Sequence, residues 1–296
     1  MTSLRSRFQR KEIVVAPGCY DALSALMIEQ AGFPAAYFSG ASLAYTRFGR
    51  PDIGLVAADE VVDAVAAVRE RVELPLIVDC DTGFGNALNV MRTVKTMARA
   101  GAAAIQLEDQ TSPKRCGHLA DKSLIGAREM VGKLKAALDA RRDPDFFIAA
   151  RTDAAGVDGL NAAIERARLF MEAGADMAKP MGVDTIEDIK RVLREVGGPH
   201  MATLSQAAGL KKRSLEELEA AGVVAATFPS IALFAAANAV RNVLRILKAE
   251  NSLTATFDHL LPLDDYYELV GLKAMLTREE SYDKAAEALT HKRAAE

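Results

Sequence analysis

Cysteines and long apolar runs are scarce in this sequence of 296 residues. The three cysteines, Cys19, Cys80 and Cys116, have no metal-ligand spacing. An odd number of cysteines without a signal peptide is typical of free thiols in a reducing compartment, so we expect a cytoplasmic protein. Because no apolar run reaches the length of a membrane span, we expect no membrane partner.

A strong charge of one sign is also absent. The formal net charge is −3 and the basic residues are scattered, which argues against a nucleic-acid partner. The short basic run at 211–213 is interpreted as the solvated start of a helix. No segment has the composition of a linker. Half of the residues are apolar, which is enough for a large core in one large domain or two small ones.

Strand-like apolar runs alternate with helical patterns along most of the chain. Eight such runs begin near Ile13, Ala35, Leu76, Ala104, Phe146, Met177, His200 and Val223. The helical patterns lie at about 22–31, 57–72, 87–100, 126–142, 159–173, 185–195, 214–221 and 231–249. This alternation predicts one TIM-type (β/α)8 barrel domain over residues 1–296. Residues 251–296 are predicted to form a helical C-terminal extension that could pack against another subunit.

The alternative architecture is a doubly wound open sheet. No Gly-x-Gly-x-x-Gly motif follows the first strand, which disfavours the dinucleotide-binding form of that fold. The first strand is predicted to end at Pro17-Gly18, and Asp21 is predicted to cap the next helix. Ala-Gly pairs at 31–32, 100–101, 173–174 and 221–222 each follow a helical pattern, so their glycines fit the left-handed position that closes a helix.

An acidic pair follows the third predicted strand. Asp79 and Asp81 stand at i and i+2, which places both side chains on one face of an extended chain. Glycines follow at once, and a helical pattern begins near Ala87. Ligands bind at this end of the strands in parallel α/β folds, and a hard cation such as Mg²⁺ suits two close carboxylates. The alternative is that one aspartate caps the following helix and the other is solvated.

Polar side chains also follow the second, fourth and fifth predicted strands. They are Tyr37, Ser39 and Gly40, then Glu108 and Asp109, then Arg151, Thr152 and Asp153. In a barrel, all of these strand ends open at one mouth. The sequence therefore predicts a site with acidic metal ligands and an arginine that can bind a substrate carboxylate.

The loop at 113–118, called the lid loop below, places one thiol among cationic groups. Cys116 is flanked by Lys114 and Arg115 and lies two residues before His118. Positive neighbours lower the pKa of a thiol, so Cys116 is predicted to exchange protons near neutral pH. The alternative is a surface loop with an incidental cysteine. Cys19 and Cys80 adjoin apolar runs and are predicted to be inert core thiols.

Four motifs together resemble those of one enzyme superfamily. They are Asp-Cys-Asp-Thr-Gly-Phe-Gly-Asn (79–86), Leu-Glu-Asp-Gln (107–110), Lys-Arg-Cys-Gly-His (114–118) and Ala-Arg-Thr-Asp (150–153). The sequence resembles the isocitrate lyase/phosphoenolpyruvate mutase superfamily over about residues 16–229. The motif at 114–118 is the most specific and marks its carbon–carbon lyases. The stretch 86–92 is most similar to the dimethylmalate lyase and oxaloacetate decarboxylase branches.

The resemblance implies a set of functional residues. Asp79, Asp81 and Glu108 would bind Mg²⁺, or Mn²⁺, with Asp52 acting partly through water. The implied substrate-binding residues are Ser39, Gly40, Ala41, Asp52, Lys114 and Arg151. The implied catalytic residues are Tyr37, Cys116, His118 and Arg151, with Cys116 protonating a departing enolate. The barrel's last helix would be exchanged between the subunits of a homotetramer, a dimer of dimers.

The implied activity is that of a Mg²⁺-dependent carbon–carbon lyase acting on a small carboxylic acid. The substrate would be a malate-type 2-hydroxy dicarboxylic acid, cleaved to an α-keto acid and a carboxylic acid. The alternatives are an oxaloacetate decarboxylase or hydrolase, an enzyme resembling carboxyphosphonoenolpyruvate mutase, and a non-catalytic keto-acid-binding protein. Cys116 favours the lyase, because the decarboxylase branch lacks that cysteine.

Two positions depart from the superfamily's lyase pattern. Met181 stands where those lyases carry a glutamate, and Thr203 stands where they carry an asparagine. The missing groups bind the distal carboxylate of the substrate, so the resemblance implies that tricarboxylic substrates are poor. Lys179 either supplies a new positive charge or is solvated.

Overall fold

The structure is a computed structural model that describes residues 4–9, 12–207 and 209–295. Within these residues, eight parallel strands follow the order β6-β5-β4-β3-β2-β1-β8-β7. They are β1 (Val14–Cys19), β2 (Ala36–Phe38), β3 (Leu76–Asp79), β4 (Ala104–Glu108), β5 (Phe147–Thr152), β6 (Met177–Pro180), β7 (Met201–Thr203) and β8 (Ala225–Phe228). A parallel bridge between Ala178 and His200 joins the two ends of this order. The nearly closed sheet confirms the predicted TIM-type barrel and excludes the open sheet.

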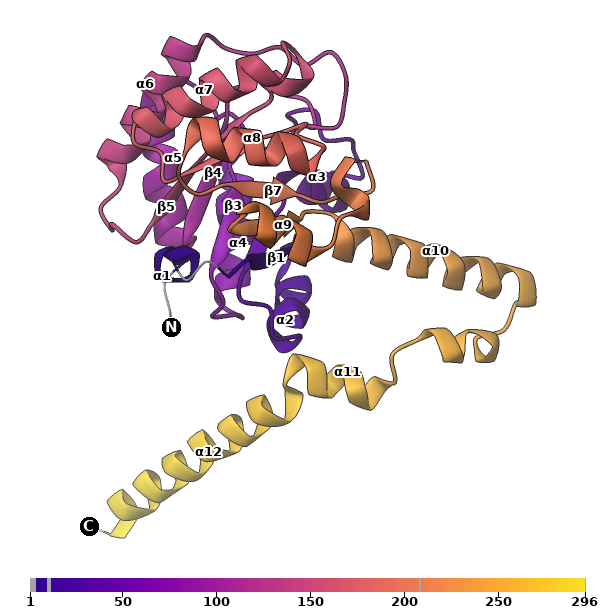
Figure 1. Cartoon of the computed structure of the whole chain (residues 1–296). Coiled ribbons are helices and arrows are strands. Elements are labelled where there is room, and N and C mark those ends of the chain that lie inside the picture. The colour runs from indigo at the N-terminus through magenta and orange to yellow at the C-terminus, as the bar shows by residue number, and fades with distance from the viewer. Residues whose placement is uncertain (1–3, 10–11, 208, 296) are drawn as a thin grey trace. The chain divides into compact units, whose positions relative to one another are not determined.

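Helices of residues 1–235 surround the strands, as Figure 1 shows. They are α1 (Leu4–Gln9), α2 (Ala22–Gln30), α3 (Gly40–Phe48), α4 (Ala58–Arg69), α5 (Ala87–Ala100), α6 (Ala127–Ala140), α7 (Leu160–Glu172), α8 (Ile186–Val196) and α9 (Leu215–Ala221), with 3-10 turns η1 (Ala154–Gly156) and η2 (Gly209–Lys212). The remaining elements are α10 (Ile231–Glu250), the 3-10 turn η3 (Thr254–His259), α11 (Leu263–Val270) and α12 (Leu272–Ala295). None of the helices in the described ranges is both long and apolar enough for a membrane span.

Two apolar clusters stabilise the barrel. The first contains residues from all eight strands, including Ile77, Phe147 and Met201, and therefore fills the barrel interior. Leu4 and Phe8 of α1 belong to the same cluster, and the rings of Phe8 and Phe147 lie 5.0 Å apart. The second cluster packs β7 and β8 against α8 and α9. Burial of these apolar side chains is the main term that favours folding.

The helix ends follow the predicted local rules. Asp21 caps α2, since its Oδ1 accepts a hydrogen bond of 2.7 Å from the backbone N–H of Ser24. Gly101 and Gly222 close α5 and α9 with φ angles of 93° and 99°, where a side chain would be strained. Three details differ from prediction. Helices α1 and α3 were not expected, and β1 continues through Pro17-Gly18 to Cys19.

The continuation of β1 has a structural cause. The strand pairs with β8 up to Pro17 and with β2 from Gly18 onward, so one partner takes over where the other ends. Gly18 is required there, because a Cβ atom would lie 1.9 Å from the carbonyl oxygen of Pro229. The Pro-Gly pair therefore marks a change of strand partner, not the end of a strand.

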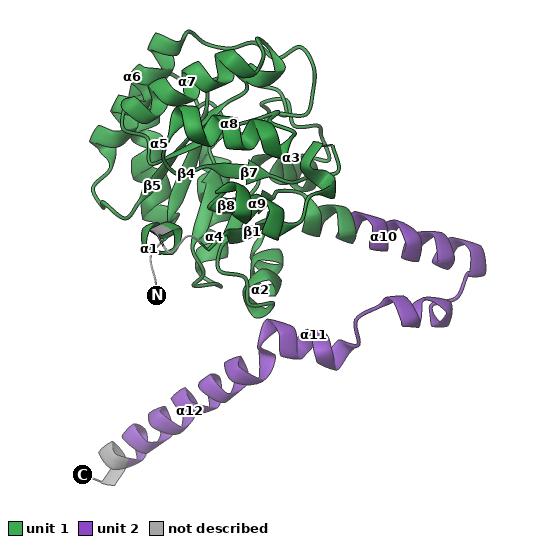
Figure 2. Cartoon of the chain, viewed as in Figure 1, with its two compact units in different colours: residues 1–235 green, residues 236–296 purple. Residues whose placement is uncertain are grey.

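The chain divides into two compact units, residues 1–235 and 236–296 (Figure 2). The first unit holds the barrel. The second holds most of α10 together with η3, α11 and α12, and α10 and α11 contain no buried residue. The assignment of the whole chain to one barrel domain with an extension from residue 251 stays a prediction.

Candidate functional site

The three predicted metal ligands lie together at the carboxyl ends of β3 and β4. Asp79 ends β3, Glu108 ends β4, and Asp81 follows in the loop after β3. One oxygen from each carboxylate lies within 4.8 Å of the others, and all three residues are buried. The backbone N–H of Glu108 donates to the carbonyl of Asp81, which fixes the loop against β4. Pairing of adjacent strands therefore places the three acids in one cluster.

The acidic pair does not cap the following helix. Asn86 caps α5, and its Oδ1 accepts hydrogen bonds from the backbone N–H groups of Leu88 and Asn89. Asp81 has a φ angle of 47°, an uncommon conformation for a residue with a side chain. The capping explanation for this pair is therefore wrong.

The acid cluster fits a divalent cation. In the described part of the chain, Glu108 Oε1 is buried with no hydrogen-bond partner, and the buried oxygens Asp81 Oδ1 and Glu108 Oε2 have only ion-pair contacts. Burial raises the pKa of Asp81 to about 6 and that of Glu108 well above its ordinary value. Both shifts express the cost of a buried negative charge, which a hard cation bound by oxygen ligands would offset.

Two basic side chains already contact these acids. Arg151, from β5, places Nη1 2.8 Å from Glu108 Oε2. Its Nε and Nη2 donate to the two oxygens of Asp153 at 2.9 and 3.0 Å. Lys114 of the lid loop places Nζ 2.5 Å from Asp52 Oδ1 and 2.9 Å from Asp81 Oδ1. Opposite charges therefore alternate across this part of the mouth.

The two other acids that follow strands have structural partners. Asp153 orients Arg151 through the pair of hydrogen bonds just described. Asp109 accepts from the hydroxyl of Thr152 at 2.6 Å, from the backbone N–H of Asp153 at 3.0 Å, and from Arg166 at 3.1 Å. These acids orient the arginine and the end of β5, and they lie outside the triad of Asp79, Asp81 and Glu108.

Cys116 lies on the lid loop beside the basic and acidic cluster. Its backbone N–H donates to the carbonyl of Asp52 at 3.1 Å. Burial raises the pKa of its thiol, and the lowering by Lys114 and Arg151 is smaller. The predicted lowering of this pKa is therefore wrong, because the thiol is half-buried and desolvation opposes the thiolate. Cys19 and Cys80 are buried, as predicted, and burial raises the pKa of Cys19 to about 12.

The second strand leads into α3, which the sequence analysis missed. Ser39 caps α3 through a hydrogen bond from the N–H of Ser42 at 3.2 Å, and a serine at this position is the signal that was available. A Cβ on Gly40 would lie 3.5 Å from Asp81 Oδ1, so the first turn of α3 adjoins the acid cluster. Ala41 lies in the same turn. Buried Tyr37 hydrogen-bonds to Asp79, and burial raises its pKa well above its ordinary value.

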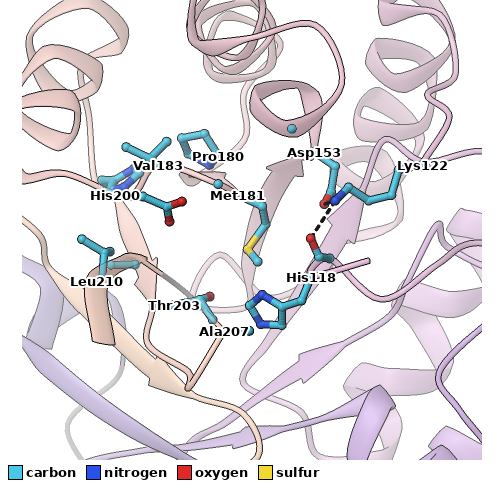
Figure 3. Close-up of a pocket in the computed structure, with 15 residues that line it drawn as sticks. His118, Lys122, Asp153, Pro180, Met181, Val183, His200, Thr203, Ala207 and Leu210 are labelled. Atoms are coloured by element: carbon cyan, nitrogen blue, oxygen red, sulfur yellow. Dashed lines mark hydrogen bonds and ion pairs between the residues drawn. The ribbon is translucent and has the colours of Figure 1, made fainter. Parts of the chain in front are cut away.

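A cavity of about 190 Å³ lies on the β6 and β7 side of the mouth (Figure 3). Its lining includes Met181 and Thr203, the two positions that depart from the lyase pattern, and His118 of the lid loop. His118 Nε2 lies 3.0 Å from Ser205 Oγ, and burial lowers the histidine's pKa. A Cβ on Gly117 would lie 2.5 Å from Arg151 and 3.1 Å from Met181, so the lid loop passes close to both.

Lys179 is buried and not solvated, with a relative exposure of 1%. Its Nζ lies 2.5 Å from Gln106 Oε1, and Gln106 Nε2 donates to Asp79 Oδ1 at 3.0 Å. Gln106 was not among the site residues predicted from the sequence. A polar residue inside the otherwise apolar start of β4 was the available signal.

A (β/α)8 barrel with buried charged side chains at the carboxyl ends of its strands is the arrangement of an α/β-barrel enzyme. The chain belongs to the phosphoenolpyruvate phosphomutase family, whose sequence pattern matches residues 4–248. It is 37% identical to a 2,3-dimethylmalate lyase from Eubacterium barkeri over 94% of this chain and 96% of that protein. It is 39% identical to a 2-methylisocitrate lyase from Aeropyrum pernix over 97% of this chain and 92% of that protein.

The fold is also similar to that of a solved oxaloacetate acetylhydrolase. The TM-score is 0.89 at 30% identity, and the match covers 95% of this chain and 96% of that one. The family assignment confirms the predicted superfamily. The names of the relatives support the predicted enzyme class, a carbon–carbon lyase.

Proposed function

We propose that the protein is a Mg²⁺-dependent carbon–carbon lyase that cleaves a malate-type 2-hydroxy dicarboxylic acid to an α-keto acid and a carboxylic acid. Candidate substrates are 2,3-dimethylmalate and compounds that resemble methylisocitrate. The observation that carries this proposal is the connection between the lid loop and the acid cluster. Cys116 binds the backbone of Asp52, whose carboxylate binds Lys114, and Lys114 in turn contacts Asp81. The residue that bears the thiol is thus linked, through Asp52 and Lys114, to the three clustered carboxylates.

The metal would be held by Asp79, Asp81 and Glu108, with Asp52 contributing through water and Mn²⁺ as an alternative ion. When bound, Mg²⁺ supplies Lewis-acid stabilisation of oxygen atoms in the reacting acid. Lys114 and Arg151 offset part of the negative charge of Asp81 and Glu108. Arg151 is also proposed to bind a substrate carboxylate. The first turn of α3 offers the backbone N–H groups of Gly40 and Ala41 to the same carboxylate. Ser39 caps this turn, and its own N–H donates to the carbonyl of Cys19.

The proposed cleavage begins when the 2-hydroxyl group of the substrate loses its proton to a base. The carbon–carbon bond beside it then breaks, and the hydroxyl-bearing carbon becomes the carbonyl of the keto acid. The electron pair of the broken bond leaves with the other fragment as an enolate, which takes a proton from the Cys116 thiol. A raised thiol pKa suits this role, because it keeps the proton on sulfur near neutral pH until the enolate forms. Tyr37 and His118 are proposed to position the reacting groups.

The β6 and β7 side of the mouth supports a preference for dicarboxylic acids. Met181 offers only apolar contact, and Thr203 Oγ1 lies 3.1 Å from Thr227 Oγ1. A distal carboxylate buried against Met181 and Thr203 would gain no charged partner from either side chain, which is costly. Lys122 also lines the cavity, but its Nζ already donates to the carbonyls of Gly117 and Leu119. We therefore propose that a small or alkyl-substituted dicarboxylic acid is the preferred substrate.

An oxaloacetate hydrolase or decarboxylase is the second candidate, favoured by the likeness to oxaloacetate acetylhydrolase. A product assay separates the candidates. The protein is incubated with Mg²⁺ and either 2,3-dimethylmalate, 2-methylisocitrate or oxaloacetate, and the products are separated and quantified. The lyase should form equal amounts of a keto acid and a second acid from a hydroxy acid. Oxalate with acetate would indicate hydrolysis of oxaloacetate, and pyruvate with CO₂ would indicate decarboxylation. Turnover of oxaloacetate alone would contradict the lyase proposal.

We also propose that the protein is a cytoplasmic homotetramer, a dimer of dimers, in which the C-terminal helices contact neighbouring subunits. Large apolar side chains exposed in residues 236–296 support this. They include Val240, Leu244, Phe257, Leu261, Leu263, Tyr266, Met275 and Leu276. Such extended apolar exposure is typical of protein–protein interfaces. Light scattering coupled to gel filtration should give four times the chain mass, and a monomer would contradict the proposal.

A further inference from the structure

Lys179 is a buried cation without a carboxylate partner. It projects from β6 with 1% exposure, and within the described residues no carboxylate lies at ion-pair distance from its Nζ. Its neighbours are Gln106 Oε1 at 2.5 Å and the ring of Tyr37, whose centroid lies 4.7 Å from Nζ. Burying a charge without an opposite charge is costly, and burial lowers the pKa of this lysine to about 7. Because this burial destabilises the fold, the presence of a lysine at position 179 needs an explanation other than stability.

The contact with Gln106 has a direction. An ammonium group only donates hydrogen bonds and a carboxylate only accepts them, whereas an amide has one end of each kind. In its charged form, Lys179 can therefore bind only the oxygen end of the Gln106 amide, and the Asp79 carboxylate can bind only its nitrogen end. Both contacts are made, at 2.5 and 3.0 Å. The lysine thus selects the orientation of the amide in which its N–H₂ group faces Asp79.

We propose that Lys179 is a positioning residue, which holds the Gln106 amide so that its nitrogen fixes the Asp79 carboxylate for metal binding. This inference rests on the proposed function, in which Asp79 is a metal ligand. Partners behind a ligand typically change metal affinity by about 10- to 100-fold when they are removed. Without Lys179, the amide can turn its oxygen toward Asp79, which would repel the carboxylate and displace it.

The charge of Lys179 predicts the opposite effect. A buried positive charge near the acid cluster repels a cation, so removing it should strengthen metal binding. If Lys179 acts only as a nearby charge, its loss will tighten binding. If it acts through the amide, its loss will weaken binding as long as Gln106 is present. The sign of the change therefore separates the two explanations.

The test is calorimetric titration with Mn²⁺, which needs no substrate or turnover. Lys179→Met should weaken Mn²⁺ binding about tenfold, and Gln106→Ala should weaken it by a similar factor. In the Gln106→Ala background, Lys179→Met should cause no further loss, because there is no amide left to orient. Lys179→Gln, an uncharged donor, should bind Mn²⁺ more tightly than Lys179→Met. Lys95→Met, on the exposed face of α5, is the control for loss of a distant charge and should bind as the wild type does.

Each other outcome has a definite meaning. Wild-type or tighter Mn²⁺ binding by Lys179→Met would overturn the proposal, and so would an equal loss of affinity in the presence and absence of Gln106. If Lys179→Met does not fold, the same comparison is made with Lys179→Gln, whose effect must disappear in the Gln106→Ala background. Asp79→Ala separates a failure of the proposed metal site from a failure of the positioning role of Lys179. Unchanged Mn²⁺ binding in Asp79→Ala would reject the metal site itself. If Asp79→Ala loses Mn²⁺ binding and Lys179→Met binds Mn²⁺ as the wild type does, only the positioning role is rejected.

Discussion

The mouth of the barrel has two sides that differ in how closely their acidic and basic groups are paired. On the side formed by β3, β4 and β5, acidic and basic groups alternate, and Glu108 with Arg151 and Asp81 with Lys114 lie within 3 Å of each other. On the side formed by β6 and β7, the uncharged side chains of Met181 and Thr203 line a cavity together with Lys122, Asp153 and Asp184. Met181 and Thr203, the two positions that depart from the lyase pattern, both lie on the β6 and β7 side.

From this difference we propose that chemistry and substrate choice depend on separate groups in this protein. Changes on the β3 to β5 side should reduce turnover of every substrate, since all substrates would share the metal and the thiol. Changes on the β6 and β7 side should alter the ratio between substrates. Single substitutions on the two sides of the mouth can therefore separate the residues needed for turnover from those that select the substrate.

The largest effect is expected for Asp79→Ala. Removing this carboxylate leaves Asp81 and Glu108 without the third acid of the cluster, so Mg²⁺ binding should weaken strongly and activity should fall to background. Calorimetric titration with Mg²⁺ and a product assay measure the two effects. Asp63→Ala, which removes an exposed carboxylate of α4, should leave both unchanged. Equal Mg²⁺ affinity in Asp79→Ala and wild type would contradict the assignment of the metal site.

The next largest effect is expected for Cys116→Ser. A serine hydroxyl is a much weaker acid than a thiol, so kcat should fall by roughly a hundredfold or more, the usual scale of general acid–base catalysis. KM should change little, because the substitution keeps the shape of the side chain. Cys19→Ala, at a buried thiol, should retain wild-type kcat. Near wild-type turnover in Cys116→Ser would favour decarboxylation, where a proton-donating thiol is not required.

Much of the barrel could be predicted from the sequence because its signals are local. The α5 boundaries at 87 and 100 match the prediction, since a polar cap precedes the helix and a glycine follows it. Helix α1 has only six residues, too few for a periodic pattern, and it is stabilised by contacts of Leu4 and Phe8 with the barrel interior. Contacts of that kind depend on distant residues and leave no local signal.

The acid triad could likewise be predicted, because strand ends and residue spacing place it. The burial of individual side chains and their long-range partners could not be predicted from the sequence. The half-buried environment of Cys116 reverses the expected direction of its pKa shift. Asp109 pairs with residues more than 40 positions away, and Lys179 contacts Gln106 across 73 positions. Thr152, a partner of Asp109, lies on the adjacent strand β5, and Lys179 lies on β6, two strands away from Gln106 on β4. Composition near either residue could not reveal these contacts.

The buried side chain of His200, directly before β7, predicts a pH effect on stability. Burial and the nearby charge of Lys179 lower the pKa of His200 to about 4. Its ordinary pKa is about 6.5, so between pH 6.5 and 4 the unfolded chain binds the proton that the folded chain excludes. Stability from this residue is therefore fully present above pH 6.5 and is lost as the pH falls toward 4. The expected loss is about 2–3 kcal/mol.

Urea unfolding at fixed protein concentration, at pH 7 and pH 4.5, measures this effect. His200→Leu should reduce the difference in unfolding free energy between the two pH values, because it removes the group that titrates. His259→Leu, at an exposed histidine, should leave the difference as in the wild type. If His200→Leu shows the same difference in unfolding free energy between pH 7 and pH 4.5 as the wild type, then groups other than His200 account for the acid sensitivity.

The smallest effect is a change in the ratio between substrates. Met181 lines the cavity on the β6 and β7 side, and its apolar side chain offers a distal carboxylate no opposite charge. We therefore expect kcat/KM for 2,3-dimethylmalate to exceed that for 2-methylisocitrate. Met181→Glu restores the residue type of the superfamily's lyases at this position and should shift the ratio toward 2-methylisocitrate by about tenfold, which corresponds to about 1.4 kcal/mol. Met181→Gln, of similar size but uncharged, is the matched control. A wild-type preference for 2-methylisocitrate would mean that other side chains bind the distal carboxylate, and the two sides of the mouth would then not divide chemistry from substrate choice.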